Sequence, residues 1–147
     1  MARKKGTQLP KQASVIPYRF GESGLEFCLI TTRRSSRWSF PKGWIGNAQA
    51  PHEAALEEAL EEAGLIGSIV DGPLGQYTHK KQGQRLLVVV MLMDVTRVLD
   101  QWHEATQRQR RWVSLQEADA LLDRPALRQM LLEAVKRLTA ADSKHSA

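Results

Sequence analysis

Hydrophobic residues fall into β-type runs near the start and the middle of the chain. Residues 13–20 (ASVIPYRF) and 25–32 (LEFCLITT) are rich in β-branched and aromatic residues, and the intervening GESG is typical of a hairpin turn. Residues 85–95 (RLLVVVMLMDV) form the longest apolar run, which predicts a buried central strand. A further short strand is predicted at 110–115 (RRWVSL), whereas residues 69–84 are typical of loop and hairpin.

Helical patterns occupy two other regions. Pro51 suits a first helical position, Glu53 the first turn and Gly64 a left-handed C-cap, so residues 51–63 predict a helix with both ends marked. Apolar residues recur at helical spacing in SLQEADALL (114–122) and PALRQMLLEAVKRL (125–138), which predicts one or two amphipathic helices. The elements therefore belong to a chain that mixes strands and helices.

Length and composition suit one globular domain, since the chain has 147 residues of which 42% are hydrophobic and 25% charged. We assign this domain to residues 13–140, with a basic N-terminal segment at 1–12 and a C-terminal tail at 141–147. The sequence has no run of about 18 apolar residues and no apolar stretch behind its basic start, so we expect a cytoplasmic protein without a membrane partner. Cys28 is the single cysteine, and its apolar surroundings indicate core filler.

Charge is divided unevenly along the chain. The net charge is +5, but residues 43–79 contain no Lys or Arg and carry −6, which leaves +11 on the rest. A basic protein with a purely acidic segment favours two kinds of partner, a polyanion for the basic part and a cation for the acidic part. A metal-chelated phosphate satisfies both.

The acidic segment places five glutamates on the predicted helix 51–63. Residues four apart on a helix are neighbours, so several pairs repel by roughly 0.2–0.5 kcal/mol each. At about 100° per residue, Glu58, Glu61 and Glu62 converge on one patch, which suits a hard divalent cation such as Mg²⁺. The alternative is a solvated acidic face. The metal interpretation is favoured because no Lys or Arg on this helix relieves the repulsion and a glycine-containing loop, FPKGWIG, leads into it.

The segment from Gly43 to Leu65 resembles the Nudix box, G-x5-E-x7-R-E-U-x-E-E-x-G-U, in which U is a bulky aliphatic residue. The first glycine, the glutamate after the arginine position, the paired glutamates and the closing Gly-Leu all match, in an intact register. Three positions depart from the pattern, because Gln49 replaces the first glutamate, Glu57 the arginine and Ala59 a larger aliphatic residue.

The resemblance extends to about residues 13–122, through RWSFPKGW, GQYTHKKQGQR and VLDQWHEATQRQRRWVSLQEADALL. These segments are similar to the diphosphoinositol and dinucleoside polyphosphate phosphohydrolase branch of the Nudix hydrolases. The resemblance implies an α+β fold, an α/β/α sandwich with a mixed β-sheet flanked by helices, and the glutamate helix in a loop-helix-loop motif. It also implies Mg²⁺-dependent attack of water on a diphosphate linkage, with Mn²⁺ as a substitute.

Residue roles follow from the same resemblance. Glu58, Glu62 and the main-chain carbonyl of Lys42 would hold metal, and Glu61 would be the base for the attacking water, with Glu58 as its catalytic partner. Glu57 cannot supply the positive charge of the box arginine, which leaves three explanations: another cation such as Lys42 or Arg37 substitutes in space, the enzyme is slow, or the chain is a binding module. Glu104 is the only acidic residue near the position of a late acidic residue found in some Nudix enzymes.

Basic residues around the box indicate a polyphosphate, because arginine suits bidentate phosphate contact and lysine acts as a point charge. The residues expected to bind this small-molecule substrate are Lys11, Arg33, Arg37, Gly43, Lys80, Lys81, Arg85 and Arg108. The branch resemblance favours a dinucleoside polyphosphate or a diphosphoinositol polyphosphate. Nucleic-acid binding is the competing explanation, since a pI near 9.7 and four tryptophans also suit backbone contacts and base stacking. That alternative gives no reason for the cation-free glutamate helix.

Overall fold

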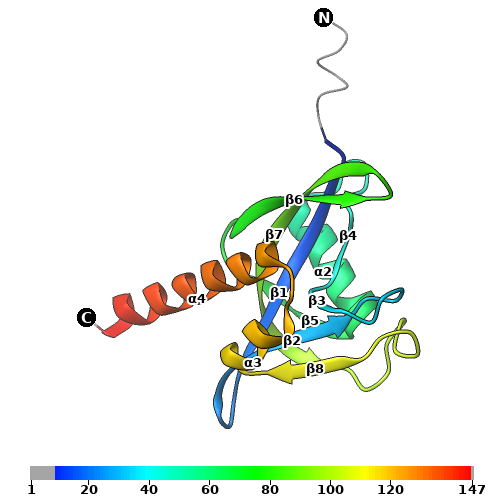
Figure 1. Cartoon of the computed structure of the whole chain (residues 1–147). Helices are drawn as coiled ribbons and strands as arrows, with labels where there is room; N and C mark the ends of the chain where they lie inside the picture. The colour runs from blue at the N-terminus through cyan, green and yellow to red at the C-terminus, as the bar shows by residue number, and fades with distance from the viewer. Residues whose placement is uncertain (1–8, 147) are drawn as a thin grey trace, which may run out of the picture.

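A computed structural model describes the backbone of residues 9–146 and the side chains of residues 9–140. Most of the basic N-terminal segment predicted at 1–12 lies outside the described residues. The elements, drawn in Figure 1, are β1 (Lys11–Gly21), β2 (Gly24–Thr31), β3 (Trp38–Ser39), β4 (Lys42–Trp44), α2 (Pro51–Ala63), β5 (Leu65–Ile69), β6 (Gly75–Lys81), β7 (Gln84–Val98), β8 (Arg110–Val113), α3 (Leu115–Leu121) and α4 (Pro125–Ser146).

The strands form one mixed sheet. Its main path runs in the order β3-β2-β1-β7-β5, while β4 pairs with β1, β6 with β7 and β8 with β2. The β1 and β7 strands are parallel, and all other pairs are antiparallel. The predicted apolar strand 85–95 is the middle part of β7, which has neighbours on both sides and is therefore central. The predicted mixed β-sheet flanked by helices is confirmed.

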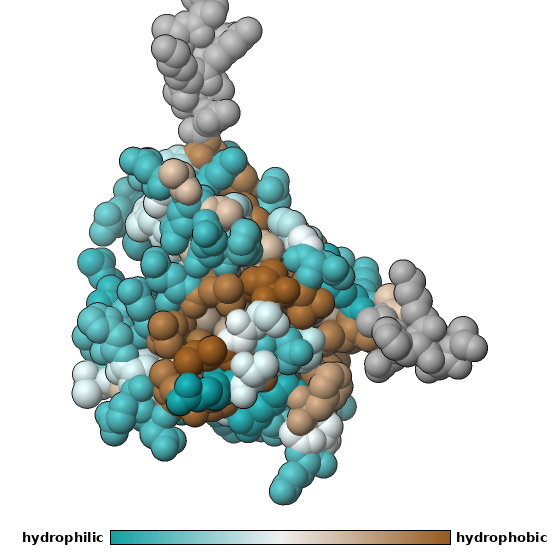
Figure 2. Space-filling model, turned by 180° about the vertical axis from the view of Figure 1, so that it is seen from behind, coloured by the Kyte–Doolittle hydropathy of each residue, from teal (hydrophilic) through white to brown (hydrophobic). Residues whose placement is uncertain are grey.

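Two hydrophobic cores lie against the sheet. One core joins alanines of α2, such as Ala55 and Ala59, to Val15 and Met93 from the strands. The other joins residues of α3 and α4, such as Leu131, to the opposite side chains of the strands. Small residues let α2 approach the sheet closely, which fixes its distance from β1 and β4. In the view from behind, apolar residues gather in the middle of the face and hydrophilic residues surround them (Figure 2).

Helix α2 has the ends that the sequence predicts. Pro51 occupies the first turn, and the Glu53 carboxylate accepts a 2.7 Å hydrogen bond from the backbone N–H of Ala50. Gly64 ends the helix with φ 66°, a left-handed conformation that costs glycine little. Local signals were sufficient here because a proline, an acidic first turn and a glycine each act within one turn of the helix.

Some elements differ from the sequence prediction. The strands β3, β4 and β5 lie in segments that carry no clear β pattern, and β1 begins at Lys11, two residues before the predicted start. Helix α4 continues to Ser146, through most of the segment predicted as a tail. In the described part of the chain, no helix has the length and apolar character needed to cross a membrane.

Candidate active site

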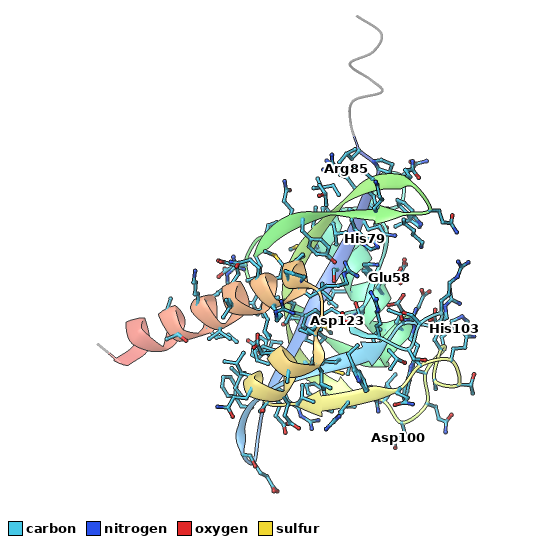
Figure 3. All side chains as sticks on the ribbon, in the orientation of Figure 1. Glu58, His79, Arg85, Asp100, His103 and Asp123 are labelled. Atoms are coloured by element: carbon cyan, nitrogen blue, oxygen red, sulfur yellow. The ribbon has the colours of Figure 1, made fainter. Side chains whose placement is uncertain are left out.

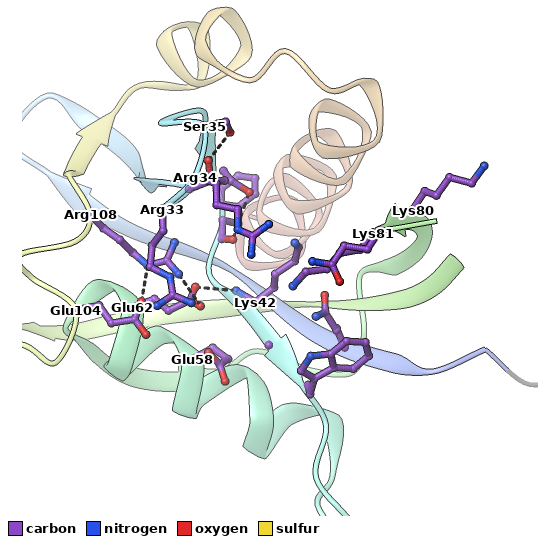
Figure 4. A pocket seen from close by; sticks show the side chains of 17 residues that line it. Arg33, Arg34, Ser35, Lys42, Glu58, Glu62, Lys80, Lys81, Glu104 and Arg108 are labelled. Carbon is purple, nitrogen blue, oxygen red and sulfur yellow. Dashed lines mark hydrogen bonds and ion pairs between the residues drawn. The ribbon is translucent and has the colours of Figure 1, made fainter. Parts of the chain in front are cut away.

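An open cavity of about 920 Å³ lies between strands β1, β3 and β4, helix α2 and the β6–β7 hairpin. Figure 4 shows Glu58, Glu62 and Glu104 toward one side of it, with Arg33 and Arg108 beside them, and Lys42, Lys80 and Lys81 toward the other side. The cavity is lined by Gln12, Thr32, Arg33, Arg34, Ser35, Ser39, Phe40, Lys42, Gly43, Trp44, Glu58, Glu62, Lys80, Lys81, Gln82, Glu104 and Arg108. The sequence segments that supply this lining are far apart along the chain and meet only in the fold.

Two glutamates of α2 reach the cavity past strand β4. Glu58 and Glu62 are one helical turn apart and so lie on the same face of α2. Glu58 packs over Gly43, where a Cβ atom would lie only 2.2 Å from the carboxyl carbon of Glu58. The glycine at the start of the box motif therefore makes room for this carboxylate, and a larger residue would displace it.

Arg108 supplies the positive charge that α2 itself lacks. Its guanidinium lies 3.1 Å from the Glu62 carboxylate and 2.7 Å from that of Glu104, and it donates a 3.0 Å hydrogen bond to the carbonyl of Thr31. The three charged side chains are only 10–14% exposed. Glu62 also accepts a 3.1 Å hydrogen bond from the backbone N–H of Lys42, so both of its oxygens have donors.

The segment that carries Arg108 also closes the C-terminal end of α2. Trp102 donates its indole N–H to the carbonyl of Glu62 at 3.0 Å, and Arg110 donates to the carbonyl of Ala63 at 2.8 Å. The backbone N–H of Glu104 bonds the carbonyl of Glu61 at 3.1 Å. These groups satisfy carbonyls that a helix end leaves without partners. Because the last turn of α2 has no basic residue, its stabilising charge comes from this distant segment.

The two carboxylates of the cavity have perturbed acidities. Burial raises the pKa of Glu58 to about 8, and repulsion from Glu62 and Glu61 adds to the rise. Burial also raises the pKa of Glu62, while Arg108 and the Lys42 N–H oppose the rise. Of the two, only Glu62 has an ion pair within the described residues. Without a cation, Glu58 therefore holds a proton at neutral pH.

The opposite wall of the cavity is cationic. Burial lowers the pKa of Lys42 to about 8, and repulsion from Arg124 and Lys81 contributes to the fall. Burial and the charges of Lys42 and Arg124 lower the pKa of His79 to about 4, so this histidine is neutral at pH 7. Burial is the larger cause of both shifts and crowded positive charge adds to it, and an anionic ligand in the cavity would relieve the repulsion.

The predicted site residues divide into two groups. Those that line the cavity are Arg33, Lys42, Gly43, Glu58, Glu62, Lys80, Lys81 and Arg108, together with Glu104. Lys11, Arg37, Glu61 and Arg85 do not contribute to the lining formed by the described residues. In Figure 3, Arg85 lies by the upper hairpin, away from Glu58.

The residues outside the lining have other surroundings. Arg37 lies 3.7 Å from Asp123 in an exposed pair, and Arg85 donates to the hydroxyl of Thr78 at 3.4 Å. Neither Lys42 nor Arg37 replaces the missing box arginine next to Glu62, since Arg108 holds that place. Arg108, predicted to bind substrate, uses its guanidinium on protein groups instead.

Sequence reasoning missed several lining residues, including Gln12, Arg34 and Trp44. Arg34 belonged to a basic cluster that the sequence displayed. Gln12 had no local signal, and Trp44 was noted only as one of four tryptophans that could stack on bases. The two residues meet through the pairing of β1 with β4, where they are direct partners. Only knowledge of that register could have placed them in one site.

The donor set suits a hard divalent cation. Two carboxylates, one of them without an ion-pair partner in the described chain, lie side by side next to the backbone of Lys42. The described residues contain no group of three or more His, Cys, Asp or Glu side chains arranged to hold a metal. Mg²⁺ commonly binds one or two carboxylates and completes its shell with water and substrate phosphate, so this set fits it.

Comparisons with known proteins show what this chain is similar to. A family model described as NUDIX domain matches residues 9–134. Nudix hydrolase 4 of Arabidopsis thaliana is 30% identical over 141 residues, 89% of this chain and 68% of that protein. Diphosphoinositol polyphosphate phosphohydrolase 3-alpha of Mus musculus is 26% identical over 114 residues, 76% of this chain and 68% of that protein. A binary complex of C. elegans Ap4A hydrolase has a similar fold, with a TM-score of 0.79, 22% identity, and 90% and 99% of the two chains covered.

Replacing Arg108 by alanine should lower the free energy of unfolding by about 3–5 kcal/mol, because two buried carboxylates lose their partner. Arg108→Lys should fall between this variant and the wild type, since a single ammonium cannot span three acceptors. Urea unfolding at pH 7 measures both. The control is Arg37→Ala, whose exposed ion pair should be worth at most about 1 kcal/mol. Equal losses for Arg108→Ala and Arg37→Ala would contradict the assigned role of Arg108.

The raised pKa of Glu58 predicts a pH-dependent stability in the metal-free protein. A carboxyl whose pKa rises from 4.5 to about 8 on folding favours the folded state at low pH, and this contribution is lost as pH increases through that window. His79 acts in the opposite direction below pH 6.5, so the comparison is made between pH 6.5 and 8. In EDTA, the difference in stability between wild type and Glu58→Gln should shift in favour of the variant over this interval. A difference that stays constant would show that Glu58 titrates normally.

Proposed function

Because the chain belongs to the Nudix hydrolase family, we propose that it hydrolyses a diphosphate linkage with the help of Mg²⁺. The substrate class is a dinucleoside polyphosphate or a diphosphoinositol polyphosphate. The observation that carries this proposal is one cavity that is lined both by paired glutamates and by several basic side chains. A metal ion complements the glutamates, and a polyphosphate complements the basic side chains.

Glu58, Glu62 and the main-chain carbonyl of Lys42 would hold the metal, with Mn²⁺ as a substitute for Mg²⁺. Bound there, a divalent cation lowers the pKa of water and polarises a phosphoryl oxygen. Glu62 is held by Arg108 and the Lys42 N–H, so its position is fixed before any ligand arrives. Glu58 must lose its proton when a cation binds, which links metal uptake to proton release.

Glu61 is our candidate for the base that accepts a proton from the attacking water. It precedes Glu62 on α2, its charge acts on Glu58, and it has no ion pair among the described side chains. A free carboxylate beside two carboxylates assigned to metal is available for proton transfer. Glu61 does not line the cavity formed by the described residues, and we assign it the role of base because it lies close to Glu58 and matches the family pattern.

The basic residues of the lining would bind the phosphates. Among the described residues, Arg33 donates only to the exposed side chain of Gln107, at 3.1 Å, and it can exchange this contact for a phosphate oxygen. Lys80 and Lys81 of the β6–β7 hairpin border the same cavity. A phosphate beside Lys42 would also return its pKa toward the ordinary value of lysine, so binding relieves the repulsion among these cations.

The name of the mouse relative, a diphosphoinositol polyphosphate phosphohydrolase, supports a polyphosphorylated substrate. Nucleic-acid binding has weaker support. Two of the four tryptophans are already covered by arginines, since Arg19 lies 3.9 Å from the ring centre of Trp112 and Arg110 lies 4.0 Å from that of Trp102. Those two rings are therefore poor platforms for stacked bases.

Purified protein should release phosphate products from a dinucleoside polyphosphate or a diphosphoinositol polyphosphate only when Mg²⁺ or Mn²⁺ is present. Glu61→Gln should lower kcat by about 10²–10⁴-fold, the usual contribution of a general base. Glu58→Gln should also abolish the rise in melting temperature caused by the metal, because a ligand of the folded state stabilises by mass action. Glu22→Gln, at an exposed turn outside the cavity, is the control.

The competing outcome has a different signature. A nucleic-acid binder would show tight, Mg²⁺-independent oligonucleotide binding with steep salt dependence and would turn over no diphosphate substrate. That result would overturn the proposed hydrolysis. Activity that survives Glu61→Gln unchanged would instead remove the base role from this residue.

A further inference from the structure

Gln12 and Trp44 form a pair beside the cationic wall of the cavity. They are direct partners in the antiparallel pairing of β1 with β4, so their side chains lie on the same face of the sheet. Both line the cavity. Lys42 lies two residues before Trp44 on β4 and shares that face, about 6.8 Å away along the strand.

The amide of Gln12 has hydrogen-bonding capacity that the described protein does not use. The residue is 3% exposed, and its Oε1 atom is buried without a partner among the described residues. A buried amide oxygen without a donor is unfavourable, and most such groups in folded proteins are paired. Rotation of the terminal amide exchanges its oxygen and nitrogen, so the group can accept from or donate to a ligand in the cavity.

Trp44 presents an aromatic surface to the same space. It is 48% exposed although it lines the cavity, whereas the rings of Trp102 and Trp112 each have an arginine over them. An exposed indole face at the wall of a pocket gains stability when a planar ring covers it. Every nucleobase has such a face, and an inositol ring has none.

We propose that Gln12 and Trp44 form a nucleobase subsite, in which the base stacks on Trp44 and hydrogen-bonds to the amide of Gln12. This inference rests on the proposed function and narrows it, since it favours the dinucleoside polyphosphate over the diphosphoinositol polyphosphate. The phosphate chain of a base held there meets Lys42 first, and the hairpin residues Lys80 and Lys81 border the same cavity. The base contacts and the carboxylates then engage different parts of one substrate.

The test compares two ligands that differ only by a nucleoside, adenosine 5′-tetraphosphate and inorganic tetrapolyphosphate. Calorimetry in EDTA measures binding without turnover. Trp44→Ala should weaken binding of the adenosine ligand by roughly 5- to 150-fold, the range for loss of one stacked base. Trp44→Phe should retain most of the affinity because a ring remains. Both variants should bind inorganic tetrapolyphosphate within about twofold of wild type.

Gln12→Met keeps the length of the side chain and removes the amide, so it should weaken binding of adenosine 5′-tetraphosphate by about 2- to 12-fold. Phe20→Ala is the matched control, since Phe20 is an aromatic residue 66% exposed and outside the cavity lining. The proposed subsite is overturned if Trp44→Ala leaves the affinity for adenosine 5′-tetraphosphate unchanged or lowers the affinity for both ligands equally.

The binding test and the hydrolysis test fail separately. If wild-type protein with Mg²⁺ hydrolyses no diphosphate substrate while the Trp44 effect is selective for the adenosine ligand, the proposed function fails and the subsite stands. If hydrolysis occurs and the selective effect is absent, the subsite fails and the proposed function stands.

Discussion

The ion pair between Arg108 and Glu62 is the interaction on which the site depends. Helix α2 carries five glutamates and no Lys or Arg, so its carboxylates repel one another unless a charge comes from elsewhere. Arg108 supplies that charge from a distant segment, and Glu104 and the Thr31 carbonyl fix the direction of its guanidinium. Arg108 and the Lys42 N–H thereby favour the carboxylate form of Glu62 against the effect of burial, while Glu58, with no such ion pair in the described chain, is free to respond to a cation.

The segment that carries Arg108 also fixes the position of α2, and with it the position of Glu62. Leu99, Trp102, Glu104 and Arg110 bond four successive carbonyls at the end of α2, from Glu61 to Gly64. Arg110 also stacks on Trp102, which joins the two donors to each other. A helix end closed in this way cannot move independently of the segment that carries Arg108. The position of the glutamates is therefore set by tertiary contacts as much as by the helix itself.

The sequence allowed the elements with strong local signals to be predicted. Helix α2 was predicted from Pro51 to its C-cap at Gly64, and the central strand β7 from its apolar run, because each signal acts within a few residues. The short strands β3 and β4 could not be predicted, since each is defined by its partner rather than by its own residues. The role of Arg108 was missed for the same reason. Its basic character was visible, but only the fold shows that carboxylates already occupy its guanidinium.

The carboxylates assigned to the metal and the side chains assigned to the base and the phosphates come largely from different elements of the fold. The carboxylates assigned to metal come from α2, whose place is fixed by the segment 99–110 and by the space above Gly43. The side chains assigned to the base and the lysines assigned to the phosphates come from β1, β4 and the β6–β7 hairpin, and β4 also contacts the glutamates through the Lys42 N–H and the space above Gly43. Changes at the rim, as at Trp44, can then alter which molecule binds while the buried Glu62 and Arg108 keep their geometry. The departure at Glu57 fits this division, because it exposes charge on the outer face of α2 and leaves the buried ion pair intact.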